Sequence, residues 1–363
     1  MGKVLLKEII FNPEYIGNLA KAISEQTGSK AKQVEKAILN SDWKKLELLD
    51  RVHHIADALK QFLPKEYGKA IALLKQARKQ MPILKHSNFA DILFSDFVAR
   101  NGLNDFKLSI NALENFTVES SSEFAVRPFI IKYPKRMMGQ MLSWTQSKNL
   151  HIRRLASEGC RPRLPWGIAL ADFKIDPAPI MPILEALKDD KEEYIRRSVA
   201  NNLNDIAKDH PAMVVKTAKK WYGKNENRNK LVKHALRTLL KKGNADALSI
   251  FGYGNIKELK IDDLKTGKRN YRIGEHLDFE LKLATKSNKV FRVEYVIHYM
   301  KANGKTNPKV FQLAERVFRE NETIGRKHSL KQMTTRKHHP GLHKLAIHIN
   351  GIEVNIIEFN LQS

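Results

Sequence analysis

The sequence contains only one cysteine, Cys160, among its 363 residues. A single cysteine cannot form a disulfide within the chain, and it excludes a zinc site built from cysteines. Such scarcity is typical of proteins in reducing compartments. We therefore expect no disulfide framework.

Long apolar runs are also missing. The apolar segment near the N-terminus, residues 4–6, is too short for a secretory signal peptide, and a lysine follows it at once. No stretch approaches the roughly 20 apolar residues that cross a bilayer. We expect a soluble, cytoplasmic protein that does not bind membranes.

Acidic residues are few relative to basic ones. The chain has 39 Asp and Glu against 64 Lys and Arg, which gives a formal net charge of +25. An excess of this size attracts polyanions, of which nucleic acid is the most common. The length exceeds what one hydrophobic core usually supports, so we expect two domains.

The first part of the chain has helical periodicity. Asn12, Pro13 and Glu14 form a helix start signal, with a capping side chain, proline at the first helical position and acid in the first turn. Apolar residues then follow at helical spacing: Ile16, Leu19, Ala20 and Ile23. A later segment does the same with Val52, Ile55, Ala56 and Leu59.

An internal repeat follows. The segment HIRRLA at 151–156 recurs as YIRRSV at 194–199, an offset of 43 residues, and more weakly as LVKHAL at 231–236. This period is typical of HEAT-type helix pairs, which stack into a superhelix with a concave face. Basic pairs in register on successive repeats predict a positive track for backbone phosphates.

The chain changes character near residues 252–257. Segments 277–283, 291–299 and 345–349 alternate apolar and polar residues, and the last runs into Asn350-Gly351, a strong hairpin signal. Several short strands within about a hundred residues indicate a β-sandwich.

The most unusual stretch is residues 153–167. Gly159 is a helix stop signal, so Glu158 lies in the last helical turn, where the helix dipole disfavours a carboxylate unless arginines compensate. Arg161 and Arg163 follow directly, and Pro162 and Pro165 stiffen the loop that carries Trp166. The plainer interpretation is a surface salt bridge of Glu158 with an arginine one turn earlier, and a Trp166 buried between repeats.

Two further carboxylates have plain interpretations of their own. Asp205 lies on a polar stripe with Arg197 and Asn201, opposite an apolar stripe, and such a stripe faces either solvent or a ligand. Ser120 and Glu123 have the spacing of a capping box, which is the stronger interpretation on spacing alone.

Three segments resemble AlkC-type DNA alkylpurine glycosylases, and the resemblance covers nearly the whole chain. They are residues 122–129 (SEFAVRPF), 153–166 (RRLASEGCRPRLPW) and 194–205 (YIRRSVANNLND). The resemblance implies an all-α HEAT-like repeat domain over residues 1–255 and an immunoglobulin-like β-sandwich over 256–363. It implies removal of cationic alkylated bases, 3-methyladenine and 3-methylcytosine, from double-stranded DNA, without metal or organic cofactor.

Carried over by position, the resemblance makes Glu123, Glu158 and Asp205 the active-site carboxylates and Trp166 the aromatic beside the lesion, with Asp172 a lesser candidate. We expect a monomer that contacts DNA through both domains. The predicted contacts are Arg127, Arg153, Arg154, Arg161, Arg163, Arg196, Arg197, Lys233, and, in a histidine-rich turn of the β-domain, His338 and His339. Two alternatives stay open from sequence: a non-catalytic nucleic-acid scaffold, and a module that binds an acidic protein.

Overall fold

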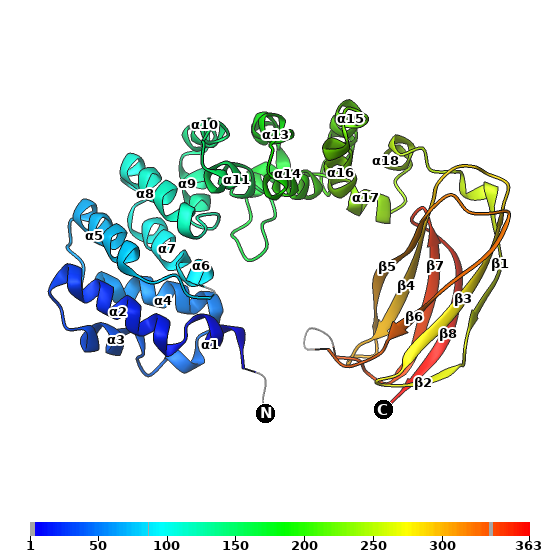
Figure 1. Cartoon of the computed structure of the whole chain (residues 1–363), viewed down its shortest axis with the longest axis horizontal. Helices are drawn as coiled ribbons and strands as arrows, with labels where there is room; N and C mark the ends of the chain where they lie inside the picture. Colours follow the sequence, from blue (N-terminus) through cyan, green and yellow to red (C-terminus); the bar gives the residue numbers. More distant parts are fainter. Residues whose placement is uncertain (1–3, 86, 334–336) are drawn as a thin grey trace. The chain divides into compact units, whose positions relative to one another are not determined.

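The structure is a computed structural model that describes residues 4–85, 87–333 and 337–363. It divides into two compact units, Met1–Asp209 and His210–Ser363 (Figure 1). Helices make up the first unit, and four helices followed by two β-sheets make up the second. None of the helices in the described ranges has the length and apolar character that a membrane crossing requires.

Short helices joined by tight turns form the first unit. Their bounds are α1 Leu6–Ile10, α2 Pro13–Thr27, α3 Ala31–Ile38, η1 Trp43–Lys45, α4 Leu48–Lys60, α5 Tyr67–Gln80, α6 Ser87–Ala90, α7 Ile92–Asn101, α8 Phe106–Glu119, α9 Val126–Lys132, α10 Pro134–Trp144, α11 Leu150–Glu158, α12 Ala171–Ile175, η2 Ala178–Ile180, α13 Met181–Leu187 and α14 Glu193–Ile206. The α11 helix packs against α8, α10, α13 and α14, and is therefore at the centre of its neighbours.

Local sequence explains these helices. The Asn12 side chain caps α2 by accepting a hydrogen bond from the Tyr15 backbone N–H at 2.9 Å, and Pro13 occupies the first helical position, as predicted. The apolar faces expected for α2 and α4 are both buried. The three repeat segments fall on α11, α14 and the later helix α16, so each copy marks one helix.

The second unit begins with helices and continues as strands. Its elements are α15 Pro211–Trp221, α16 Glu226–Ala235, α17 Arg237–Lys241, α18 Ala245–Ile250, η3 Ile256–Glu258, β1 Leu259–Thr266, β2 Asn270–Arg272, β3 His276–Thr285, β4 Phe291–Met300, β5 Thr306–Arg316, β6 Asn321–Ser329, β7 Gly341–Ile349 and β8 Ile352–Gln362. The change from helix to strand falls close to residue 256, whereas the compact units divide after Asp209. The four helices α15 to α18 are thus grouped with the sandwich in one compact unit, and the predicted domain boundary at residue 256 stays a prediction.

The strands form an immunoglobulin-like sandwich of two sheets. One sheet has the order β1-β3-β6, and the other has the order β2-β8-β7-β4-β5. Apolar side chains from both sheets form one core, with Leu277, Phe279 and Leu281 of β3 buried as their alternation predicted. The helical repeat region followed by an immunoglobulin-like β-domain confirms the predicted fold class.

Strand β4 differs from its prediction because both of its faces are buried. The face expected to be polar and solvated carries Arg292 and Glu294, which form an ion pair at 2.6 Å. Glu315 of β5 lies 3.6 Å from Arg292, pairs with Lys233 of α16 at 2.5 Å, and accepts a hydrogen bond from Tyr253. These contacts attach the helices of the second unit to the five-stranded sheet.

The hairpin predicted at Asn350-Gly351 connects β7 and β8. Both turn residues have positive φ, 51° and 79°, as a type I′ turn requires. The turn also contacts the helical segment, because a Cβ on Gly351 would lie 2.2 Å from the Gly243 nitrogen and 2.7 Å from the Leu240 oxygen. Glycine is needed here both for its conformation and for space.

The substitution Gly351→Ala tests this close approach. We expect it to lower the free energy of unfolding by at least about 2 kcal/mol more than Gly304→Ala does, because Gly304 also has a positive φ (+75°) but open space around its Cβ position. Gly304→Ala should cost only the left-handed backbone strain, about 1 kcal/mol. Urea unfolding of both variants measures the difference, and equal losses would show that the approach is unimportant.

Candidate active site

Three carboxylates from separate segments meet through two arginines. Arg154 of α11 pairs with Glu123 at 2.5 Å, and Arg161, just after α11, pairs with Glu158 at 2.5 Å and with Asp205 of α14 at 2.8 Å. A longer contact of 3.7 Å joins Arg154 to Glu158. We call these five residues the carboxylate–arginine chain. Glu123 therefore does not complete a capping box: its carboxylate binds an arginine from another helix.

The carboxylate–arginine chain is largely buried. The side chains of Glu158 and Asp205 are only 6% and 3% exposed. Burial opposes the charge on Arg161, but Glu158 and Asp205 outweigh it and raise the pKa of the guanidinium. Lys208 also pairs with Asp205, at 3.2 Å, so three cations face the three carboxylates, which are held in place before any ligand binds.

A pocket of about 540 Å³ opens beside the carboxylate–arginine chain. Arg154 and Glu158 form its wall on the α11 side, and α14 supplies the rest of its lining: Glu193, Tyr194, Arg197, Ser198 and Asn201. The ring of Tyr194 lies 4.8 Å from the Arg154 guanidinium, a cation–π contact. The predicted polar stripe of α14 thus divides, because Arg197 and Asn201 line the pocket while Asp205 is buried.

Arg127 holds the loop that follows α11. Its side chain is fully buried, and the guanidinium donates hydrogen bonds to the carbonyls of Gly159 (3.0 Å), Arg161 (2.9 Å) and Ile168. Burial lowers the pKa of Arg127 to about 10, so it still carries its charge at neutral pH. Arg127 therefore fixes the backbone on both sides of the loop that carries Arg161 and Trp166.

Trp166 lies on that loop with its side chain largely exposed. It is 66% exposed, has a positive φ of 66°, and its ring lies edge-to-face with Phe89 at 6.3 Å. A positive φ is rare for such a bulky residue, and the surrounding structure must hold it. Trp166 is thus presented for contact rather than buried between repeats, although it does not line the pocket. Asp172 is exposed in the first turn of α12 and takes no part in the ion pairs of the carboxylate–arginine chain.

Several basic residues that were predicted to contact DNA are bound to other groups of the protein. Arg127 and Arg153 are buried, and Arg153 pairs with Asp190 at 2.6 Å, so both guanidinium groups are bound within the protein and their phosphate contacts stay predictions. Arg154 and Arg161 belong to the carboxylate–arginine chain. The other basic residues predicted to contact DNA differ in their solvent exposure and in whether a carboxylate pairs with them.

Arg163 pairs with Asp209 at 2.6 Å, and Lys233 pairs with Glu315 within the second unit. Arg196 donates to the carbonyls of Asp190 and Lys191. By contrast, Arg197 is exposed on the pocket rim, and no carboxylate within the described ranges pairs with it.

The histidine-rich turn is not a surface feature in the way the sequence predicted. His338 is 3% exposed and packs against the Tyr299 ring, with the ring centroids 5.2 Å apart. The nearby His343 is fully buried, and its Nε2 hydrogen bonds to the carbonyl of His339. Direct DNA contact by His338 therefore conflicts with its burial, while His339 is only partly covered.

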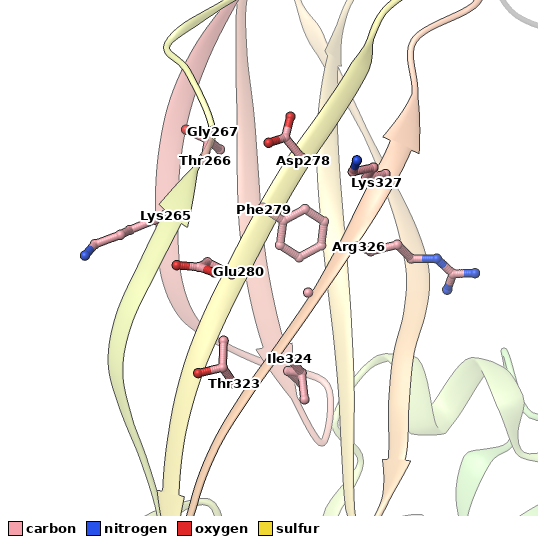
Figure 2. Close-up of a pocket in the computed structure, with 11 residues that line it drawn as sticks. Lys265, Thr266, Gly267, Asp278, Phe279, Glu280, Thr323, Ile324, Arg326 and Lys327 are labelled. Atoms are coloured by element: carbon pink, nitrogen blue, oxygen red, sulfur yellow. The ribbon is translucent and has the colours of Figure 1, made fainter.

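A second hollow, of about 650 Å³, lies on the three-stranded sheet of the β-domain (Figure 2). Its charges oppose one another across strands, since Lys265 faces Glu280 and Lys327 faces Asp278 in the register. Its floor is Gly325, where a Cβ would lie 2.3 Å from the Phe279 carbonyl oxygen. Balanced cross-strand charges stabilise a solvated sheet face, so this hollow is a weaker candidate site.

Sequence reasoning missed three residues of the site, Glu193, Tyr194 and Ser198, and it also missed the positioning role of Arg127. A signal for Ser198 existed, because its place in the repeat is that of Leu155, and a polar residue at an apolar repeat position indicates a buried partner. That partner is Glu158, which accepts a hydrogen bond from Ser198 at 2.6 Å.

Comparison with known proteins agrees with this architecture. A sequence model of DNA alkylation repair enzymes matches residues 70–239, and one of the C-terminal Ig-like domain of the uncharacterised protein YhaZ matches residues 260–363. YhaZ of Bacillus subtilis (strain 168) is 42% identical over 359 residues, covering 98% of this chain and 99% of the relative.

A solved structure extends the comparison to three dimensions. The Pseudomonas fluorescens alkylpurine DNA glycosylase AlkC, bound to DNA containing an abasic site analog, matches with a TM-score of 0.91 and 35% identity, over 99% of this chain and 100% of that one. The chain belongs to the AlkC-like family of DNA alkylation repair enzymes.

The hold of Arg127 on the loop is testable by hydrogen–deuterium exchange. We expect Arg127→Met to speed amide exchange across residues 159–170, because three carbonyls lose their donor. Arg51→Met is the matched control, since Arg51 is also fully buried but binds the Lys7 carbonyl and Glu8. The control should leave residues 159–170 unchanged. Equal acceleration of this loop in both variants would mean only general destabilisation.

Proposed function

We propose that the protein is a DNA glycosylase that hydrolyses the N-glycosidic bond of cationic alkylated bases, 3-methyladenine and 3-methylcytosine, in duplex DNA. The carboxylate–arginine chain beside an open pocket is the observation that carries this proposal. Membership of the AlkC-like family supports it, as does the DNA bound to the Pseudomonas fluorescens relative. The reaction is the first step of base excision repair.

The chemistry suits fixed negative charge. The alkylated base is already cationic, so it leaves with the electron pair of the glycosidic bond and becomes neutral without a strong general acid. The sugar develops oxocarbenium character at C1′, and preorganised carboxylates stabilise that charge. Water then bonds to C1′, and its proton passes to a carboxylate or to solvent. Trp166, held at the surface, would stack on the sugar or the cationic base.

Arg154 and Arg161 stabilise the buried carboxylates. A carboxylate that is buried without a partner would take up a proton, whereas ion pairing and hydrogen bonds keep it charged. Of the three carboxylates in the carboxylate–arginine chain, Glu158 is the one that lines the pocket, and Arg161 holds it through an ion pair. Glu158 is therefore the group to which we assign stabilisation of the sugar, with Glu123 and Asp205 fixing the two arginines.

The role of Glu158 is tested by base release from duplex DNA treated with a methylating agent. We expect Glu158→Gln to lower the single-turnover rate roughly 100-fold or more, with DNA affinity retained, because the amide removes the negative charge and keeps the shape. Glu66→Gln is the control, since Glu66 is exposed and pairs with Lys69, outside the carboxylate–arginine chain. Tight DNA binding without any base release by the wild type would favour the non-catalytic scaffold instead.

Arg197 is the cation that we assign to a DNA phosphate, because it is exposed on the pocket rim and no carboxylate of the described ranges pairs with it. We expect Arg197→Gln to weaken duplex binding several-fold and to reduce the slope of log affinity against log salt by about 0.9. Arg163→Gln should change both less, since Asp209 already neutralises that side chain. Fluorescence anisotropy titrations at several salt concentrations measure both quantities. Equal effects would remove the distinction between them.

A further inference from the structure

Two buried serine hydroxyls form a row of hydrogen bonds that ends at Glu158. Ser198 of α14 donates to the Glu158 Oε2 at 2.6 Å, and Ser157 of α11 lies 2.6 Å from Ser198, oxygen to oxygen. Ser157 also lies 3.2 Å from the Arg154 carbonyl. Both serines are buried, at 0% exposure for Ser157 and 2% for Ser198.

The single hydrogen on each hydroxyl fixes the direction of this row while Glu158 is ionised. Ser198 must donate to the carboxylate, because an ionised carboxylate only accepts hydrogen bonds. Ser157 must then donate to Ser198, and its contact with the Arg154 carbonyl carries no hydrogen. The carboxylate receives a short, charge-assisted bond at Oε2, while Arg161 binds Oε1 at 2.5 Å.

The same row also fits the protonated carboxyl. A proton taken from the attacking water goes to Oε2, because the Arg161 guanidinium at Oε1 can only donate a hydrogen bond, whereas the Ser198 hydroxyl at Oε2 can also accept one. The Oε2 hydroxyl then donates to Ser198, Ser198 rotates to donate to Ser157, and Ser157 rotates to donate to the Arg154 carbonyl. Each hydroxyl keeps one hydrogen throughout, so no proton has to leave the protein.

We propose that Ser198 and Ser157 form a reversible hydroxyl relay that positions Glu158 in both of its protonation states during base excision. Both are positioning residues, since they act through Glu158. The inference rests on the proposed glycosylase function and adds to it two residues and a direction of hydrogen bonding.

The relay is held in place by a further contact between its two helices. Asn202 of α14 donates to the Ser157 carbonyl at 2.8 Å and to the Cys160 sulfur at 3.4 Å, which ties α14 to the end of α11. Burial raises the pKa of Cys160 to about 12, so the thiol stays neutral and adds no charge. The two helices thus keep the serine oxygens in register.

Any pH effect arises among the charged groups that surround Glu158. On its own helix and the following loop these are Arg154 and Arg161. The neighbouring segments contribute the others: Glu123, Arg127, Glu193, Tyr194, Arg197 and Asp205. The two serines bring no charge of their own, so replacing them changes hydrogen bonding to Glu158 without adding or removing a titrating group.

The experiment compares single-turnover base release across pH for the full-length wild type, Ser198→Ala, Ser198→Thr and Ser157→Ala. We expect Ser198→Ala to lower the rate at neutral pH about tenfold and to move the acidic limb of the profile to higher pH, because the ionised carboxylate loses a donor. Ser198→Thr keeps the hydroxyl and should restore the rate and the acidic limb. Ser157→Ala should lower the rate less, about threefold, because Ser198 still donates.

Ser109→Ala controls for the loss of a buried serine. Ser109 is fully buried and hydrogen bonds to the Gly102 carbonyl and to Tyr67, neither of which belongs to the carboxylate–arginine chain or lines its pocket. It should lower thermal stability to a similar extent as Ser198→Ala and leave the acidic limb unchanged. DNA affinity, measured by anisotropy, should be the same in all the variants.

The outcomes separate the two proposals. If the wild type releases base and Ser198→Ala matches it in rate and pH profile, the relay is overturned and the glycosylase stands. If Ser198→Ala is slow at every pH with an unmoved acidic limb and Ser198→Thr does not restore it, the serine is structural and the relay is overturned. If the wild type releases no base, the proposed function fails and the relay falls with it.

Discussion

The site depends on one constraint: carboxylates that are buried must stay ionised. Arg161 meets it by binding Glu158 and Asp205 at once, and Arg154 does the same for Glu123. Removing one partner of such a pair leaves an uncompensated buried charge, which costs more than the pair gains. The helices that carry these residues are therefore bound to a single relative arrangement, and the site and the local fold stabilise each other.

The loop after α11 depends on that same arrangement through its backbone. Arg127 occupies the space beneath the loop and binds three of its carbonyls, so the position of Arg161 is fixed from both its side chain and its main chain. Gly167 approaches Arg127 so closely that a Cβ would lie 3.2 Å from its Cδ. The strained Trp166 is thus held on a rigid base, as residues poised for contact in active sites often are.

Ion pairing with carboxylates distinguishes basic residues that look equivalent in the sequence. Every arginine of the predicted positive track carries the same charge, but Arg153, Arg161 and Arg163 are bound to carboxylates, whereas Arg197 has no such partner within the described ranges. A bound guanidinium has already lost most of its attraction for phosphate. The high net charge of the chain therefore overstates the number of cations at this pocket that are free of a carboxylate partner.

Features that arise from local periodicity could be predicted from the sequence. Helix starts such as Asn12-Pro13, the alternation in β3 and the Asn350-Gly351 hairpin follow from neighbouring residues, and segment 153–166 indicates the family through its residue identities alone. Three features could not be predicted and are seen only in the folded protein: the burial of His338, the ion pair of Glu123 with Arg154 and the hydrogen bond of Ser198 to Glu158. These depend on which side chain an adjacent helix brings within about 3 Å, and residues 31 or 40 positions apart in the chain contain no local signal of that distance.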